Sequence, residues 1–164
     1  YAKNSWNGEV KPEIDQKTVQ KVFEKEDKKI TKPKKPLVNC FDATMPSITA
    51  SKKNAKIAGI NKAITFSRMD IDWLDTRLEK GSIHRIVTHP PENSSRTNKK
   101  EIEKLYIEFI HQANFVLKKT GTLTIMQRNP ALLKGIAEQK NFKIKEERTI
   151  FAGKEPMQVL VFQK

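Results

Sequence analysis

The sequence has almost no cysteine, few aromatic residues and no long apolar stretch. Cys40 is the single cysteine among 164 residues, which excludes a disulfide framework within the chain and a cysteine-based metal site. The three histidines lack metal-ligand spacing with any acid pair, so we expect no zinc. No apolar run approaches the roughly 20 residues that span a bilayer, and no signal peptide is visible. We therefore expect a cytoplasmic protein without a membrane partner, and the start at Tyr1 rather than Met suggests an excised or processed fragment.

Positive charge is in clear excess. The chain has 32 lysine and arginine residues against 19 aspartate and glutamate residues, a formal net charge of +13 at pH 7. This balance favours a polyanionic partner such as RNA or DNA, through counterion release and electrostatic steering. Aromatic residues are sparse between the basic clusters, so stacking on single-stranded bases is not indicated. The alternative is a lysine-rich protein whose charges are only solvated.

The first part of the chain differs in composition from the rest. Residues 1–36 are polar, lysine-rich and poor in branched apolar side chains. We expect a peripheral basic segment there, with a helix over residues 13–29 and a linker over 32–36 that contains two prolines. Residues 37–164 are expected to form a single domain with its own core.

From Leu37 onward, short apolar runs alternate with helical periodicity. The runs at residues 37–41, 63–69, 83–88 and 121–127 predict strands, and the segments 46–59, 98–118 and the one opened by Pro130 predict helices. The last two runs, 143–150 and 157–162, predict an antiparallel hairpin. The whole pattern is typical of an α/β fold, in which βα units surround a mostly parallel sheet.

Several phrases in this part of the chain carry a family resemblance. They are Val-Asn-Cys-Phe-Asp at residues 38–42, Asn-Ala-x-x-Ala-Gly-Ile at 54–60, Asp70 with Leu74 four residues later, and Pro90-Pro91 after an apolar strand. In this order they resemble a class I S-adenosylmethionine-dependent methyltransferase with a Rossmann-like fold. More narrowly, they are similar to the THUMP-linked RNA methyltransferases that act on guanosine N2. The resemblance implies S-adenosylmethionine as cofactor and RNA, either tRNA or rRNA, as partner.

The resemblance also implies a cofactor site at the ends of two strands. Asp42 matches the acid that accepts hydrogen bonds from the ribose hydroxyls, although an Asp at this place could instead cap the helix that follows. Asp70 matches the residue beside the adenine amino group, with Met69 and Ile71 offering apolar and main-chain contact to the ring. Two further acids, at residues 72 and 75, leave the assignment among them open.

The segment His89-Pro90-Pro91-Glu92 matches the motif that lines the target base. The family places Asp or Asn first and an aromatic residue last, because acceptors must hold the hydrogens of an exocyclic amine and a ring must face the base. A neutral His89 accepts one hydrogen bond, whereas an imidazolium accepts none. Glu92 cannot stack on a base. The alternative is a strand-ending turn that came with the fold.

One part of the family pattern has no match. Its first strand and Gly-rich turn should precede this chain's segments, but nothing in residues 1–36 resembles them, and the only glycine there is Gly8. We expect a gap in the sheet, with unpaired edges and exposed apolar surface. The missing strand could be supplied by a separate chain, could belong to an upstream segment, or the strands could pair in another order. No THUMP module is present in this chain either, which implies weak, poorly selective RNA binding.

These patterns lead to one hypothesis and one rival. The domain, incomplete on its N-terminal side, would transfer a methyl group from S-adenosylmethionine to guanosine N2 of tRNA or rRNA. Arg96, Lys99 and Lys100, which flank the Pro-Pro motif, would meet RNA phosphates. The rival is a non-catalytic RNA-binding or assembly subunit built on the same fold, favoured by His89, Glu92 and the missing turn.

Overall fold

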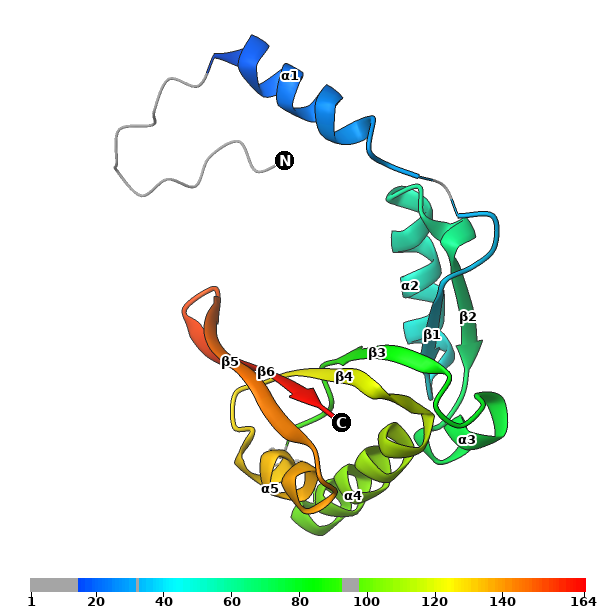
Figure 1. Ribbon diagram of the computed structural model, residues 1–164, viewed down its shortest axis with the longest axis vertical. Helices are drawn as coiled ribbons and strands as arrows, with labels where there is room; N and C mark the ends of the chain where they lie inside the picture. Colours follow the sequence, from blue (N-terminus) through cyan, green and yellow to red (C-terminus); the bar gives the residue numbers. More distant parts are fainter. Residues whose placement is uncertain (1–14, 32, 93–97) are drawn as a thin grey trace.

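A computed structural model describes residues 15–31, 33–92 and 98–164 of the chain (Figure 1). The predicted RNA contact Arg96 and all residues before Asp15 lie outside these ranges.

The helices of the described residues begin largely where the sequence predicts them. They are α1 (Gln16–Asp27), α2 (Met45–Ile57), α3 (Leu74–Arg77), α4 (Lys99–Val116) and α5 (Ala131–Gln139), with 3-10 turns η1 (Asn61–Ala63) and η2 (Ile71–Trp73). The side chains of Asp15, Thr44 and Asn98 accept hydrogen bonds from first-turn N–H groups of α1, α2 and α4. Such caps satisfy donors that every helix start leaves without a partner.

The strands form two sheets that share no hydrogen-bonded ladder. β1 (Val38–Asp42) pairs in parallel with β2 (Ile64–Arg68). The second sheet has the order β3 (Ile83–Thr88), β4 (Leu117–Gln127), β6 (Glu155–Gln163) and β5 (Lys143–Ala152). β3 and β4 are parallel, whereas β6 is antiparallel to both β4 and β5. The α/β fold and the terminal antiparallel hairpin are confirmed.

The sheet differs from the expected one in its continuity. Instead of one mostly parallel sheet, the described strands give a mixed four-stranded sheet and a separate parallel pair. The break lies between β1 and β3, each of which pairs with only one described strand. Apolar side chains are exposed on both of these strands, since Val38 is 52% and Val87 is 78% exposed. This is the place where the sequence predicts a gap.

The hydrophobic core belongs to the four-stranded sheet and the two helices packed on it. Its buried residues come from α4, β4, α5 and β6, and include Ile110, Leu123, Leu133 and Phe162. Buried and half-buried residues alternate along β4, from Gly121 to Gln127, so one face of the sheet meets the helices and the other is only partly covered. In Figure 1, α4 and α5 lie together below this sheet.

Strand β4 is longer than predicted because an irregular pairing precedes its regular part. The register jumps from Ile83–Leu117 to Arg85–Thr122, so β4 has extra residues opposite β3. Gly121 lies in this bulge, and a Cβ there would be 2.9 Å from the Lys118 carbonyl oxygen and 3.0 Å from the Leu117 side chain. The local crowding explains the glycine.

Helix α1 stands apart, and the helix layer is mostly polar outside. No residue of α1 is buried, and Figure 1 shows it projecting away from the sheets.

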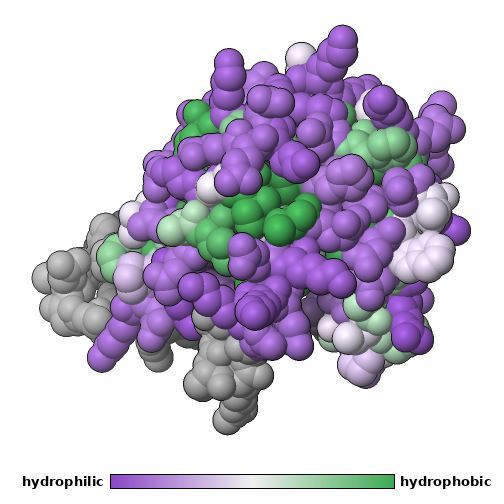
Figure 2. Space-filling model, turned by 90° about the horizontal axis from the view of Figure 1, so that it is seen from below, coloured by the Kyte–Doolittle hydropathy of each residue, from purple (hydrophilic) through white to green (hydrophobic). Residues whose placement is uncertain are grey.

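Seen from below, the surface is mainly hydrophilic with one compact hydrophobic patch near its centre (Figure 2). None of the helices in the described ranges is long and apolar enough to cross a membrane.

Candidate active site

The residues predicted for the cofactor and for the target base fall in two separate groups. The first group lies where β1 and β2 end, and the second lies where β3 and β4 end. Because parallel strands end on the same side of their sheet, each pair of strands brings its following loops together.

Asp42 ends β1 and begins the turn into α2. One oxygen of its carboxylate, Oδ1, accepts from the backbone N–H and the hydroxyl of Thr44, both at 2.8 Å. These hydrogen bonds stabilise the charged form, the one from the Thr44 N–H most, and lower the pKa of Asp42 from its ordinary 3.8. Oδ1 therefore holds Thr44, the residue that caps α2, and does not cap the helix itself. The two bonds from Thr44 use Oδ1 alone, so the other oxygen, Oδ2, is the one that can accept from a ligand.

A recess of about 430 Å³ lies beside this turn, and its size is that of a small-molecule site. It is lined by Ala43, Arg68, Met69, Asp70 and Trp73. Trp73 is 60% exposed and offers an aromatic face, while the Arg68 Nε–H donates to the Ala43 carbonyl at 3.1 Å and fixes one wall. Two of the predicted cofactor residues, Met69 and Asp70, are therefore on the recess.

Ile71, the remaining predicted cofactor residue, points elsewhere. Its side chain packs against the core of the four-stranded sheet, and its N–H donates to the Asp70 carboxylate at 2.6 Å. Asp70 caps η2 by this bond. The sequence shows the recess residues Arg68 and Trp73 only as neighbours of Asp70, with no signal of their own.

Gln112 joins the recess segment to the four-stranded half. It lies on α4, and although its side chain is polar it is only 3% exposed. Its Oε1 accepts from the Asp75 N–H at 3.0 Å, and its Nε2 donates to the Asp72 carbonyl at 3.4 Å and to Glu108 at 2.9 Å. A buried amide avoids most of its desolvation penalty when its groups are paired in this way. Gln112 thus fixes the position of η2, and nothing in the sequence pattern indicates it.

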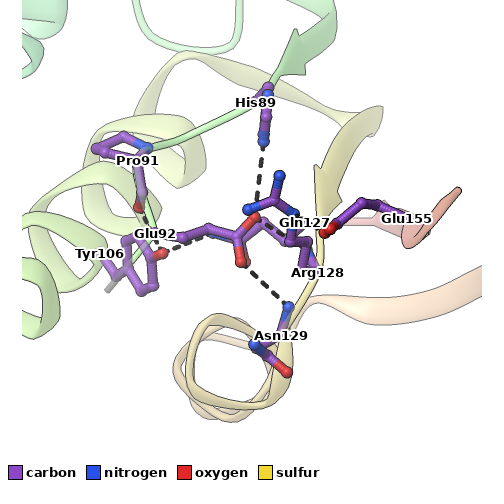
Figure 3. Close-up of polar contacts among 8 residues, drawn as sticks. All are labelled: His89, Pro91, Glu92, Tyr106, Gln127, Arg128, Asn129 and Glu155. Atoms are coloured by element: carbon purple, nitrogen blue, oxygen red, sulfur yellow. Dashed lines mark hydrogen bonds and ion pairs between the residues drawn. The ribbon is translucent and has the colours of Figure 1, made fainter. Parts of the chain in front are cut away.

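The second group is built around Glu92. Its carboxylate accepts from the backbone N–H groups of Arg128 at 2.9 Å and Asn129 at 3.2 Å (Figure 3). These residues connect β4 to α5, so the acid ties the end of β3 to the end of β4. His89 Nε2 lies 3.6 Å from the same carboxylate, and the His89 side chain is 51% exposed, against 20% for Glu92. His89 is therefore accessible, while Glu92 is held by the chain itself.

A buried hydrogen-bond chain holds the Pro-Pro segment from behind. Tyr106 O–H donates to the Pro91 carbonyl at 2.7 Å, and Gln127 Nε2 donates to the Tyr106 oxygen at 2.6 Å (Figure 3). The hydroxyl of Tyr106 has a single hydrogen, which it donates to Pro91. Its oxygen can therefore only accept from Gln127. Burial raises the pKa of Tyr106 above its ordinary 10.0, and the nearby charge of Glu92 raises it further against the Gln127 bond. Gln127 Oε1 is buried without a partner among the described residues.

The remaining predicted residues are less closely placed. Pro90 is buried, and Lys99 and Lys100 are exposed in the first turn of α4. Sequence reasoning missed Tyr106 and Gln127, which appear in it only as members of an apolar helix face and of a strand. Among the described residues, no group of three or more His, Cys, Asp or Glu side chains could hold a metal ion.

The first group fits an adenosine-like cofactor in its donor and acceptor set. An aromatic face, an apolar methionine and the Asp70 carboxylate line one recess, and Asp42 precedes Ala43 on its wall. A mixed sheet with helices packed on it and acids at strand ends defines an α/β domain with a candidate ligand site at the carboxyl ends of its strands.

Comparison with known proteins agrees and makes the assignment narrower. Residues 4–156 match the model of the RMKL-like methyltransferase domain, UPF0020, so the chain belongs to this family. A tRNA (guanine(6)-N2)-methyltransferase from Methanocaldococcus jannaschii is 25% identical over 113 residues, which are 69% of this chain and 29% of that protein.

Solved structures are similar over most of the chain. The crystal structure of TrmN from Thermus thermophilus matches with a TM-score of 0.68 and 26% identity, over 81% of this chain and 37% of that one. A possible methylase from Clostridium difficile 630 has a TM-score of 0.69 at 21% identity, over 98% of this chain and 40% of its own. The putative methyltransferase SMU.472, complexed with SAH, has a TM-score of 0.69 at 18% identity, over 92% and 38%. The chain thus spans two fifths or less of the length of each of these relatives.

Proposed function

We propose that this chain is part of an S-adenosylmethionine-dependent enzyme that methylates N2 of guanosine in tRNA or rRNA. The observation that best supports this proposal is the pair of candidate sites at strand ends. One is the recess beside Asp42 and the other contains the accessible His89. The archaeal relative, by its name, methylates guanine N2 of tRNA. A cytoplasmic location is part of the same proposal.

On the cofactor side, each residue has a distinct role. Asp42 Oδ2 accepts from ribose hydroxyls, while Oδ1 stays bonded to Thr44 and keeps the carboxylate in place. Met69 and Trp73 contact the adenine faces, and Asp70 accepts from its amino group. Ile71 acts only through its main chain and its packing. When bound, the cofactor supplies an electrophilic methyl group on its sulfonium.

On the base side, His89 acts as the acceptor. In the neutral tautomer that carries its hydrogen on Nε2, the nitrogen 3.6 Å from the Glu92 carboxylate, His89 has a lone pair on Nδ1. The lone pair of Nδ1 then accepts one hydrogen of the exocyclic amine and orients its nitrogen. The displaced proton leaves to solvent after the nitrogen–methyl bond has formed. Glu92 serves as the positioning residue for His89, and Lys99 and Lys100, with Arg96, contact phosphates.

The Pro-Pro segment must keep a fixed place for this geometry to hold. Tyr106 and Gln127 hold the Pro91 carbonyl, and Glu92 holds the backbone at Arg128 and Asn129. A shift of about 1 Å in such a segment costs on the order of a hundredfold in rate.

The proposal includes a strand that is not among the described residues 15–31, 33–92 and 98–164. A parallel strand between β1 and β3 would pair with the free edge of each and cover Val38 and Val87. Its end would lie between Asp42 and His89, where the two groups would meet. An upstream segment of a longer protein fits this role, since the chain spans 29% of the archaeal relative and 37% of TrmN.

Calorimetric titration of S-adenosylhomocysteine tests the cofactor half. Saturable binding that is lost in Asp42→Ala and kept in Asp27→Ala, on the exposed α1, supports the proposal. Binding that survives Asp42→Ala would contradict the role of that residue. Tight RNA binding without any binding of S-adenosylhomocysteine would favour the second candidate, a non-catalytic RNA-binding subunit, for which the split sheet is the specific observation.

Transfer to tRNA transcripts, followed by mass spectrometry for N2-methylguanosine, tests the other half. We expect His89→Asn to retain measurable transfer, because its amide oxygen accepts a hydrogen bond. His89→Leu should lose about a hundredfold or more. Equal activity of the two variants would show that His89 accepts nothing from the base.

A further inference from the structure

A cluster of lysines lies on the side of the four-stranded sheet opposite the candidate active site. We name it the lysine edge; it consists of Lys80, Lys118, Lys119, Lys143, Lys145 and Lys164. These residues precede β3 or lie at the start of β4 and β5 and after the end of β6. The antiparallel pairing places the end of β6 beside the starts of β4 and β5, since Gln163 pairs with Thr122 and with Lys143.

The structure brings these lysines close together. The pKa of Lys164 is lowered by burial and then by the charges of Lys80 and Lys119, which lie near it. Lys118 Nζ is 2.8 Å from His84 Nε2. Lys143, Lys145 and Lys164 line a common recess of about 430 Å³, together with the polar side chains of Asn141 and Gln163.

Acidic groups do not neutralise this charge. Among the ion pairs between described residues, none includes a member of the lysine edge. The acids nearest in sequence are Glu79, Glu146 and Glu147, of which Glu146 pairs with Arg148 and Glu147 with Lys134. Lys164 Nζ donates to the carbonyl oxygens of Asn114 and Leu117 at the end of α4. The other lysines repel one another, and a bound polyanion would relieve that repulsion.

We propose that the lysine edge binds phosphates of the folded RNA substrate, at a distance from the nucleotide that is methylated. The inference rests on the RNA substrate of the proposed function. Eight residues of β4 separate Lys119 from Gln127, which corresponds to roughly 26 Å of extended strand. A single nucleotide cannot reach both ends, so this surface reads the body of the RNA. Exposed aromatic side chains are absent from the recess lining, so the contacts are to the backbone and independent of sequence.

RNA binding measured over a series of salt concentrations tests the proposal. The variant is Lys119→Gln, Lys143→Gln and Lys145→Gln combined, and all three residues are exposed. The matched control combines Lys17→Gln, Lys21→Gln and Lys25→Gln on α1. It changes the net charge by the same amount, and none of the α1 residues is buried. Fluorescence anisotropy with a full-length tRNA transcript gives the affinity, and circular dichroism shows that each variant folds.

We expect the lysine-edge variant to bind tRNA at least about tenfold more weakly than the control at low salt. Its slope of log affinity against log salt should be smaller by roughly 2 to 3, about one for each phosphate that the variant no longer neutralises. A short RNA hairpin that ends near the target nucleotide should bind both variants equally.

The outcomes separate this inference from the proposed function. If the wild-type chain binds tRNA and both triple variants bind it equally, the lysine edge is not an RNA surface, and an acidic protein partner would then explain it. That result would leave the proposed methylation of RNA standing. If the wild-type chain shows no salt-dependent binding of tRNA at all, both are overturned.

Discussion

The two halves of the domain differ in how much they bury. The four-stranded half, with α4 and α5, contributes all fourteen residues of the main buried cluster. The two-stranded half, with α2, buries only Ile48 and Ala55 between residues 38 and 68. Hydrophobic burial is the main stabilising term in folding, so the four-stranded half carries the stability. The half that holds most of the recess beside Asp42 has little buried core of its own.

The largest effect should come from the core of the four-stranded half. Phe162 is 0% exposed and contacts Phe142 edge to face, with ring centroids 6.5 Å apart. We expect Phe162→Ala to lower the free energy of unfolding by about 3–5 kcal/mol. Phe151→Ala, in the same hairpin but 71% exposed, is the control and should change it by less than about 1 kcal/mol. Urea unfolding measures both, and similar losses would show that the hairpin contributes as a whole.

Removal of the Tyr106 hydroxyl should have the next largest effect. Tyr106→Phe leaves the Pro91 carbonyl and the buried Gln127 amide without partners, at a cost of about 1–3 kcal/mol. The double variant with Gln127→Leu should recover part of this loss, because the buried amide is then absent too. A double variant that is simply the sum of the two single ones would disprove the coupling.

The raised pKa of Tyr106 adds a pH dependence to the same pair of variants. The folded state holds the phenol proton more tightly than the unfolded chain does. Wild-type stability should therefore contain a component that is complete below the ordinary value of 10.0 and is lost as pH rises above it. Tyr106→Phe should lack this component in urea unfolding at pH values on either side of that ordinary value.

The link between the halves can be cut at Gln112. We expect Gln112→Leu to destabilise by about 1–2 kcal/mol, because it removes the acceptor for Asp75 N–H. S-adenosylhomocysteine affinity should fall about tenfold as η2 loses its anchor. The exposed Gln139→Leu on α5 is the control. If stability falls while cofactor affinity is unchanged, the recess is positioned by something other than α4.

The smallest effect should be at Asp42. Its pKa is lowered, mainly by the Thr44 N–H, so the stabilisation is present above the ordinary 3.8 and is lost as pH falls below it. Because the turn is exposed, Asp42→Asn should cost less than about 1 kcal/mol at neutral pH. The difference between wild type and Asp42→Asn should shrink on acidification. Asp27→Asn on α1 should show no such trend.

Local patterns predict most of the elements in both halves. The strand at residues 83–88 has the predicted bounds, and the helices predicted over 46–59 and 98–118 are found as Met45–Ile57 and Lys99–Val116. Each of these follows from neighbours within a few residues, so the sequence alone is sufficient. Alternation of apolar residues likewise predicts the terminal hairpin.

The contacts that shape the site could not be predicted in the same way. Glu92 bonds to a backbone 36 and 37 residues away, and Gln112 to one 37 residues away. No local pattern contains such pairings. Of the residues that the resemblance singles out, Met69 and Asp70 line the recess, while the Ile71 side chain packs on the core and leaves only its main chain for a ligand. The gap in the sheet was predictable because a whole motif is missing.

Helix α1 has a consequence for experiments on assembly. It has twelve residues, none of them buried, and exposes Val22 and Phe23 on its surface. A helix of this length is marginal in water without tertiary contacts. Its helix–coil equilibrium is therefore free of the core and responds to whatever docks against Val22 and Phe23. A rise in the far-ultraviolet helix signal on mixing with a candidate upstream segment would report that docking directly, without a label.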